Sequence, residues 1–99
     1  MAEIDITSDQ LKVVLTILSE YAPGFQAKAF GSRVTGKAGP RSDLDLVLMT
    51  SEPLSLLKLA EIREAFSESE LPFRVDVVDW AGISESFRKI IDARAVRIR

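Results

Sequence analysis

The sequence contains no cysteine and no histidine among its 99 residues. The lack of cysteine excludes disulfides, thiolate metal ligands and thiol nucleophiles. The lack of histidine excludes imidazole ligands and the general base that enzymes use most often. Any chemistry must therefore depend on carboxylates, hydroxyls, lysine and arginine.

A strong charge of either sign is also missing. Thirteen basic and 15 acidic residues give a formal net charge of −2, which produces no field able to draw in a long nucleic acid. No apolar run approaches the roughly 18 residues that a membrane span needs. The opening residues Met1 to Asp5 are acidic, unlike a targeting sequence. We therefore expect a soluble, cytoplasmic protein that binds neither long nucleic acid nor a membrane.

Length and composition predict a single domain over residues 1–99. The chain is 46% hydrophobic, and domains of roughly 100 residues are close to the commonest size. A chain of this length buries only about 60 to 65% of the surface that its unfolded form exposes. We therefore expect association with another chain, either a second copy or a different protein.

Helical and strand periodicities alternate along the chain, which predicts an α/β or α+β fold. We expect a small mixed β-sheet flanked by helices on one face. Ile4 and Ile6 are compatible with a small edge strand, and no conformation is predicted for Val96 to Ile98. The expected helices follow the Thr7–Asp9 cap up to residues 21–24 and cover 54–66 and 84–93; the expected strands cover 25–30, 44–49 and 73–80.

The most informative stretch runs from Gly31 to Leu46 and includes Asp43 and Asp45. Two aspartates separated by one residue in a strand point to the same face, where their charges repel. Aspartate is also disfavoured in strands. A hard divalent cation such as Mg²⁺ neutralises such a pair well, because it prefers carboxylate and phosphate oxygens.

Asp76 adds a third carboxylate inside the apolar run over residues 73–80. If that strand neighbours the strand over 44–49, all three carboxylates converge, and they suffice to hold two Mg²⁺ ions. Two metal ions roughly 3.5 to 4 Å apart steady both the attacking and the leaving oxygen of an in-line displacement. We expect Asp43 and Asp45 to bridge both ions, and Asp76 to complete one of them and take the proton of the incoming hydroxyl. Asp79 is left out because strand parity puts it on the opposite face, where we expect it to be solvated.

Gly31 and Ser32 lie at an expected strand-to-helix turn. Free backbone N–H groups and the positive end of a helix hold phosphates well, and Gly31 lets the backbone approach closely. The hydroxyl of Ser32 is a further donor. Among the nearby basic residues, Arg33 is placed better than Lys37 or Arg41 to reach triphosphate oxygens. We therefore expect Gly31, Ser32 and Arg33 to bind the phosphates of a nucleoside triphosphate.

Each of these features also has a purely structural alternative. A lone Gly-Ser or Asp-x-Asp is common in loops. Asp43 is compatible with a cap that follows Ser42, and Asp45 with a solvent-facing position on an edge strand. The combination with Asp76 favours metal binding over these alternatives.

Gly31-Ser32, ten further residues and Asp43-Leu44-Asp45 resemble the Gly-Ser-x10-Asp-x-Asp signature of the DNA polymerase β-like nucleotidyltransferase superfamily. Gly-Ser-Arg with a glycine three residues later, Ser-Asp-Leu-Asp-Leu and a downstream Val-Asp-Val-Val-Asp resemble its minimal nucleotidyltransferase (MNT) group. The resemblance covers nearly the whole chain. It implies the polymerase β-like nucleotidyltransferase fold, Mg²⁺ as the cofactor and ATP as the substrate.

The resemblance also implies a protein partner. MNT proteins are typically encoded beside a HEPN-domain ribonuclease toxin and act as its antitoxin, and active members transfer AMP from ATP to a tyrosine of the toxin. One alternative is a non-catalytic antitoxin that neutralises a toxin by binding alone. Another is a subunit of a larger aminoglycoside-type or tRNA-type enzyme, which would form a stable complex with a helical, non-toxic companion.

Overall fold

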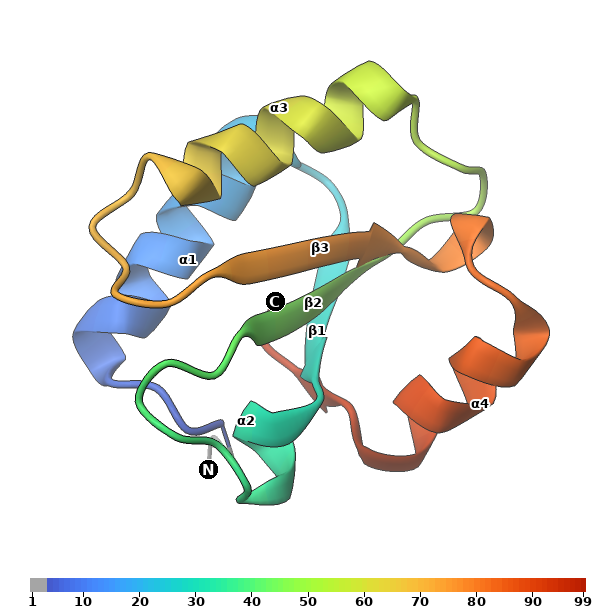
Figure 1. Ribbon diagram of the computed structural model, residues 1–99. Helices are drawn as coiled ribbons and strands as arrows, with labels where there is room; N and C mark the ends of the chain where they lie inside the picture. Colours follow the sequence, from blue (N-terminus) through green and yellow to red (C-terminus); the bar gives the residue numbers. More distant parts are fainter. Residues whose placement is uncertain (1–3) are drawn as a thin grey trace.

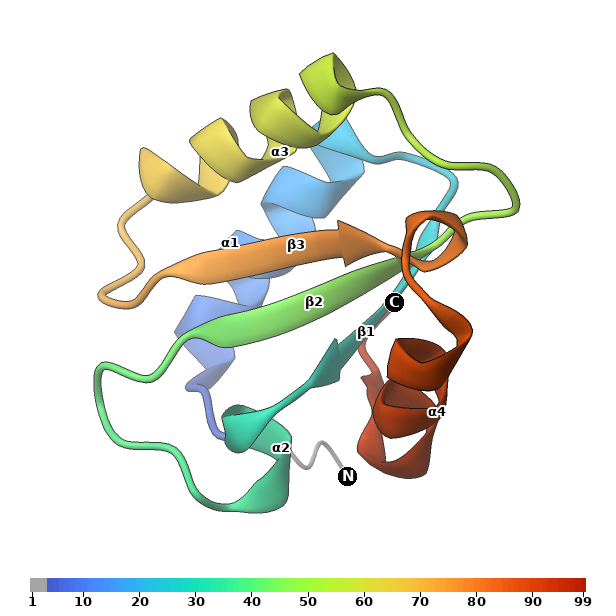
Figure 2. The same cartoon turned by 45° about the vertical axis from the view of Figure 1, so that its right-hand side comes forward.

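The structure is a computed structural model that describes residues 4–99. Figures 1 and 2 show a single twisted sheet with helices packed around it. Its elements in chain order are α1 (Ser8–Tyr21), β1 (Gln26–Phe30), α2 (Ser32–Thr35), β2 (Leu44–Met49), α3 (Leu56–Ser67), β3 (Val75–Asp79), a 3-10 turn (Trp80–Gly82), α4 (Glu85–Arg94) and β4 (Val96–Arg97).

The strands lie in the order β3-β2-β1-β4. β1 runs antiparallel to both β2 and β4, whereas β2 and β3 are parallel. The expected mixed sheet is therefore confirmed. Parallel neighbours begin at the same end of a sheet, so β2 and β3 both start near the loop that follows α2, as Figure 2 shows.

One face of the sheet forms the hydrophobic core with α1 and α3. Leu44, Leu46 and Leu48 alternate along β2 and are fully buried, and they belong to the same cluster as Leu18 of α1 and Ile62 of α3. This follows from the strand period of two, which sends alternate side chains to the same face. The intervening residues of β2, Asp45 among them, face the other side.

That other side is covered in part by α4, so the expectation that helices flank only one face is wrong. The rings of Phe30 in β1 and Phe87 in α4 meet edge to face with centroids 5.8 Å apart. Lys28 and Asp92 form a salt bridge of 3.9 Å between the same two elements. Figure 2 shows α4 on the side of the sheet away from α1 and α3.

Side-chain caps explain where the helices begin. The Thr7 hydroxyl accepts a 3.0 Å hydrogen bond from the Gln10 amide, and the Gln10 side chain accepts one of 2.9 Å from the Thr7 amide. This capping box fixes the start of α1 where it was predicted. α3 begins later than predicted because Ser55 is its cap, accepting from the Lys58 amide at 3.0 Å.

The two ends of residues 4–99 differ in secondary structure: only the C-terminal end forms a strand. Ile4 and Ile6 form no strand, although both pack against the core. The tail for which no conformation was predicted forms β4, whose Val96 and Arg97 pair with β1. Within residues 4–99, no helix has both the length and the apolar character needed to cross a bilayer.

The core position of Leu46 leads to a stability prediction. Leu46 is 0% exposed, whereas Leu57 at the start of α3 is 72% exposed. Leu46→Ala leaves a cavity in the centre of the sheet and should lower the free energy of unfolding by about 2 to 5 kcal/mol. Leu57→Ala should change it by less than about 0.5 kcal/mol. Urea unfolding measures both, and similar losses in the two variants would contradict the packing described.

Candidate active site

The predicted carboxylates lie where β2 and β3 begin. Asp45 is paired in register with Asp76 on the neighbouring parallel strand and with Phe30 on its antiparallel side. Asp43 precedes β2 by one residue and is exposed, while Asp45 and Asp76 are half-buried. Because Asp43 lies two residues before Asp45, both sit on the side of the sheet away from the main core.

None of the three carboxylates is neutralised by a basic side chain within residues 4–99. In that part of the chain, the single salt bridge within 4.0 Å joins Lys28 and Asp92. The hydrogen bonds of the same residues include none accepted by the side chains of Asp43, Asp45 or Asp76. The oxygens of all three are therefore free to bind a cation.

Burial raises the pKa of Asp45 above its ordinary value, and the charges of Asp76 and then Asp43 raise it further. Both effects disfavour the charged form of the carboxyl group. Asp76 and Asp43 are thus close enough to Asp45 to act on it electrostatically.

The side chains are nevertheless not gathered into a ready ligand set. Over residues 4–99, no group of three or more Asp, Glu, His or Cys side chains is arranged so that it could hold a metal ion. The backbone brings the three aspartates to one end and one face of the sheet. Side-chain rotation would have to bring their oxygens onto one ion. Such rotation costs little free energy for half-buried or exposed groups.

Gly31 makes room for the carboxylate of Asp45. Its backbone angles, φ 82° and ψ −156°, lie in a region that essentially only glycine adopts. A Cβ atom at this position would collide with the Asp45 Oδ2 atom. Ser32 then begins α2, and its hydroxyl makes no hydrogen bond to the described residues. The Gly-Ser turn therefore lies directly against the acidic group.

Arg33 does not fill the role that was expected of it. Its side chain is only 6% exposed. This corrects the expectation that it contacts phosphates, because its donors are already used within the protein. The guanidinium donates hydrogen bonds of 2.7 to 3.4 Å to the backbone carbonyls of Asp5, Gly39, Pro40 and Ser42.

Asp79 lies on the opposite face from Asp76, as strand parity predicted. It is not solvated as expected, however, but buried at 6% exposure. Its Oδ2 atom accepts a 2.8 Å hydrogen bond from the Leu54 amide, which ties the loop before α3 to the end of β3. Asp79 therefore has a structural role outside the acidic site.

A cleft of about 460 Å³ borders Asp76 at the outer edge of β3, with Arg63 and Arg74 among its lining residues. Sequence reasoning assigned neither arginine to the site. Arg74 carried a weak signal, since it lies two residues before Asp76, whereas Arg63 comes from a distant helix. Arg63 donates to the Val77 carbonyl at 2.8 Å and so covers part of the free edge of β3.

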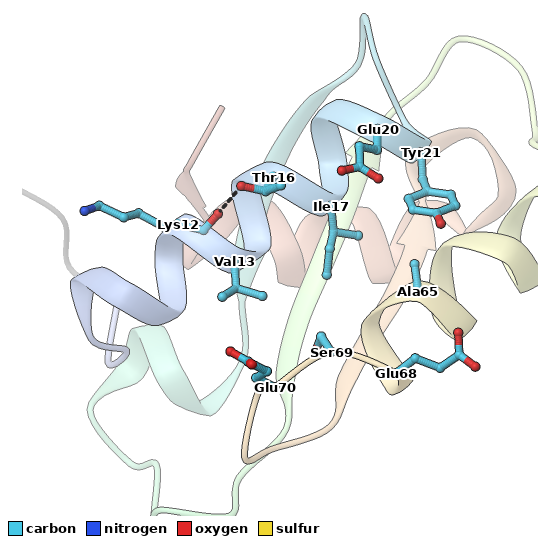
Figure 3. A pocket seen from close by; sticks show the side chains of 10 residues that line it. All are labelled: Lys12, Val13, Thr16, Ile17, Glu20, Tyr21, Ala65, Glu68, Ser69 and Glu70. Atoms are coloured by element: carbon cyan, nitrogen blue, oxygen red, sulfur yellow. Dashed lines mark hydrogen bonds between the residues drawn. The ribbon is translucent and has the colours of Figure 1, made fainter.

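A second groove, of about 500 Å³, lies between α1 and the end of α3. Figure 3 shows that Val13 and Ile17 of α1 face Ala65 and Ser69 across it, with Tyr21 at one end. The groove belongs to the helical layer on the core side of the sheet, whereas the carboxylates face the other side. It is therefore separate from the acidic site.

The raised pKa of Asp45 leads to a pH-dependent stability prediction. A carboxyl group whose pKa is raised on folding favours the folded state below its unfolded pKa, and this contribution is lost as pH rises through the folded pKa. At pH 7 without divalent cations, Asp45→Asn should therefore be more stable than the parent. The gain should stay below about 1 kcal/mol, because water screens a half-buried group.

Urea unfolding at pH 7 and near pH 4 checks this, since the gap between Asp45→Asn and the parent should shrink as the carboxyl group becomes protonated. Glu61→Gln, on the exposed surface of α3, is a matched control that should show little change. A less stable Asp45→Asn variant at pH 7 would contradict the described repulsion.

A model of the nucleotidyltransferase domain family matches residues 11–98. Over 90 residues the chain is 53% identical to a Haemophilus influenzae protein named probable protein adenylyltransferase MntA, with 91% of this chain and 79% of that protein covered.

Solved structures share the fold at lower identity. A toxin-antitoxin crystal structure with AMP-PNP matches with a TM-score of 0.78 and 20% identity, covering 90% of this chain and 72% of that one. An MNT antitoxin in complex with the tri-AMPylated HEPN toxin of Shewanella oneidensis matches with a TM-score of 0.74 and 18% identity, covering 95% and 72%. The predicted fold and the resemblance to minimal nucleotidyltransferases are therefore confirmed, and the chain belongs to the nucleotidyltransferase domain family.

Proposed function

We propose that this nucleotidyltransferase transfers AMP from ATP to a tyrosine hydroxyl of a HEPN-type protein partner, depends on Mg²⁺ and acts as the antitoxin of that partner. One observation carries the proposal: Asp45 and Asp76 lie in register on parallel strands, with Asp43 just before them and no basic side chain within residues 4–99 bound to any of them. The Gly31-Ser32 turn lies against the same group. The names of the relative from Haemophilus influenzae and of the solved complexes support the same activity and kind of partner.

The chemistry of the donor set fits Mg²⁺. Asp43, Asp45 and Asp76 offer only carboxylate oxygens, which hard divalent cations prefer, and none of these oxygens is occupied by another described side chain. We propose that these three residues hold two Mg²⁺ ions. When bound, the ions would neutralise the charge of the phosphates and the charge that develops on the attacking and leaving oxygens.

The residues of the chain then have separate roles. Gly31 and Ser32 are proposed to hold the β- and γ-phosphates through backbone amides and the Ser32 hydroxyl. The acceptor hydroxyl oxygen forms a bond to the α-phosphorus of ATP while the bond from that phosphorus to the bridging oxygen breaks. Pyrophosphate leaves with the bridging oxygen, and Asp76 takes the proton of the hydroxyl.

The acceptor is expected to approach across an interface with the partner. Residues 4–99 form one sheet with its helices, and within them no separate unit is available to bind an acceptor. The cleft that borders Asp76 lies beside β3, the outer strand of the sheet, and carries Arg63 and Arg74. A tyrosine of a second chain can therefore reach Asp76 from outside.

Transfer of label from ATP tests the proposal. The protein is incubated with Mg²⁺, the HEPN-type protein encoded beside it, and ATP labelled at either the α- or the γ-phosphate. Label from the α-phosphate should appear on a tyrosine of the partner and label from the γ-phosphate should not, because pyrophosphate leaves. Asp43→Asn should reduce labelling by at least about 100-fold through loss of a ligand, whereas Asp92→Asn on α4 should not.

The two alternative functions predict different outcomes in this experiment. Neutralisation of the partner without any label, and unchanged in Asp43→Asn, would show an antitoxin that acts by binding alone. A stable complex with a helical companion that has no toxicity would identify a subunit of a larger enzyme. Either result would overturn the proposed transfer to a toxin.

Gly31 supplies a second functional prediction. Gly31→Ala places a Cβ atom on the Asp45 carboxylate, so labelling of the partner should fall by at least about 10-fold through misplacement of a ligand. Gly36→Ala is the matched control: its φ of 81° is nearly the same as that of Gly31, but nothing lies within 4 Å of the added atom. It should lose roughly 1 kcal/mol of stability and keep the activity. Equal loss of activity in both variants would contradict the role given to Gly31.

A further inference from the structure

Arg33 of α2 joins the two halves of the Gly-Ser and Asp-x-Asp motif through space. Its Nε atom donates a 2.9 Å hydrogen bond to the carbonyl of Ser42. That carbonyl belongs to the peptide bond leading into Asp43, so the guanidinium holds the backbone one bond away from the first carboxylate residue. Arg33 itself follows Gly31 and Ser32 directly in the chain.

The same guanidinium shapes the loop before Asp43. Its Nη2 atom donates to the carbonyls of Gly39 at 3.4 Å and Pro40 at 3.1 Å. The loop is closed on itself as well, because the Gly39 amide donates to the Ser42 hydroxyl at 2.8 Å and the Ser42 amide donates to the Gly39 carbonyl at 3.1 Å. The conformation that delivers Asp43 therefore depends on a planar, multivalent donor buried beneath it.

Arg33 also contacts the segments on its other side. Its Cζ atom lies 4.0 Å from the centre of the Phe73 ring, just ahead of β3 and Asp76. Its Nη1 atom donates to the Asp5 carbonyl at 2.7 Å, and the Asp5 amide donates back to the Arg33 carbonyl at 2.6 Å. The loop before Asp43 is thus fixed to the approach to β3 and to the residues before α1.

We propose that Arg33 is a positioning residue that sets where Asp43 stands relative to Asp45 and Asp76, and thereby sets the affinity of these carboxylates for a divalent cation. The inference rests on the proposed function, because it assigns the three aspartates to a cation. Lysine cannot replace arginine here, since its ammonium group is a point charge that cannot reach several carbonyls in one plane. Arg33 acts through the backbone and touches neither the nucleotide nor the ion.

The test uses the full chain carrying Arg33→Lys and two measurements. Hydrogen exchange of the Gly39 and Ser42 amides, which are hydrogen-bonded within the loop, should become about 10-fold faster or more, because the loop opens more often. Binding of Mn²⁺, followed by electron paramagnetic resonance without nucleotide or partner, should weaken by about 10-fold or more, as is usual when a residue that orients a ligand is changed.

Two further variants separate positioning from general loss of stability. Ile62→Val trims a buried residue of α3 in the core and should leave both the loop exchange and the Mn²⁺ affinity unchanged. If Arg33→Lys does not fold, Phe73→Leu takes its place, because it removes the ring on which the guanidinium lies and keeps every polar atom of the loop. It should move both measurements in the same direction as Arg33→Lys.

Mn²⁺ affinity that stays unchanged in the arginine variant, whether or not the loop exchanges faster, would overturn the inference and leave Arg33 a purely structural residue. Absence of Mn²⁺ binding by the unaltered protein would overturn the cation site of the proposed function instead, and with it the effect assigned to Arg33 on affinity. The exchange rates of the Gly39 and Ser42 amides would still report whether Arg33 holds the loop, so the two failures are distinguishable.

Discussion

Repulsion among three carboxylates at the start of β2 and β3 is the constraint on which the rest of the site depends. Asp45 meets Asp76 across a parallel pair of strands, and no described basic side chain offsets their charge. Burial adds to the effect and raises the pKa of Asp45. Such an arrangement lowers the stability of the sheet at neutral pH. Its simplest explanation is functional: the negative charges bind a cation.

The fold withstands this repulsion because the opposite face of the same strands is firmly anchored. Leu44, Leu46 and Leu48 are buried against α1 and α3. A slip of one residue in β2 would move these leucines to the other face of the sheet and turn Asp45 into the core, which fixes the register of Asp45 against Asp76. Hydrophobic packing on one face therefore holds the charged groups in place on the other. Gly31 completes the arrangement by leaving space for the Asp45 carboxylate.

Much of this was predictable from local patterns. The boundaries of β2 and the start of α1 follow from alternation and from the capping box, which are properties of neighbouring residues. The position of α4 on the second face was not predictable, because it depends on contacts such as Phe87 with Phe30 that join distant parts of the chain. Arg33 was misjudged for the same reason: a basic residue beside a Gly-Ser turn resembles a phosphate ligand until its distant carbonyl partners are known. β4 is too short to give a periodic signal.

The proposed activity requires the three aspartates to act together on a divalent cation. The measurement that tests it most directly is a crystal structure of the chain with Mn²⁺ and a non-hydrolysable ATP analogue, with anomalous differences recorded to locate the metal. We expect anomalous peaks among the carboxylates of Asp43, Asp45 and Asp76, with the triphosphate against Gly31 and Ser32. A bound nucleotide without metal between these carboxylates, or metal held elsewhere on the chain, would contradict it.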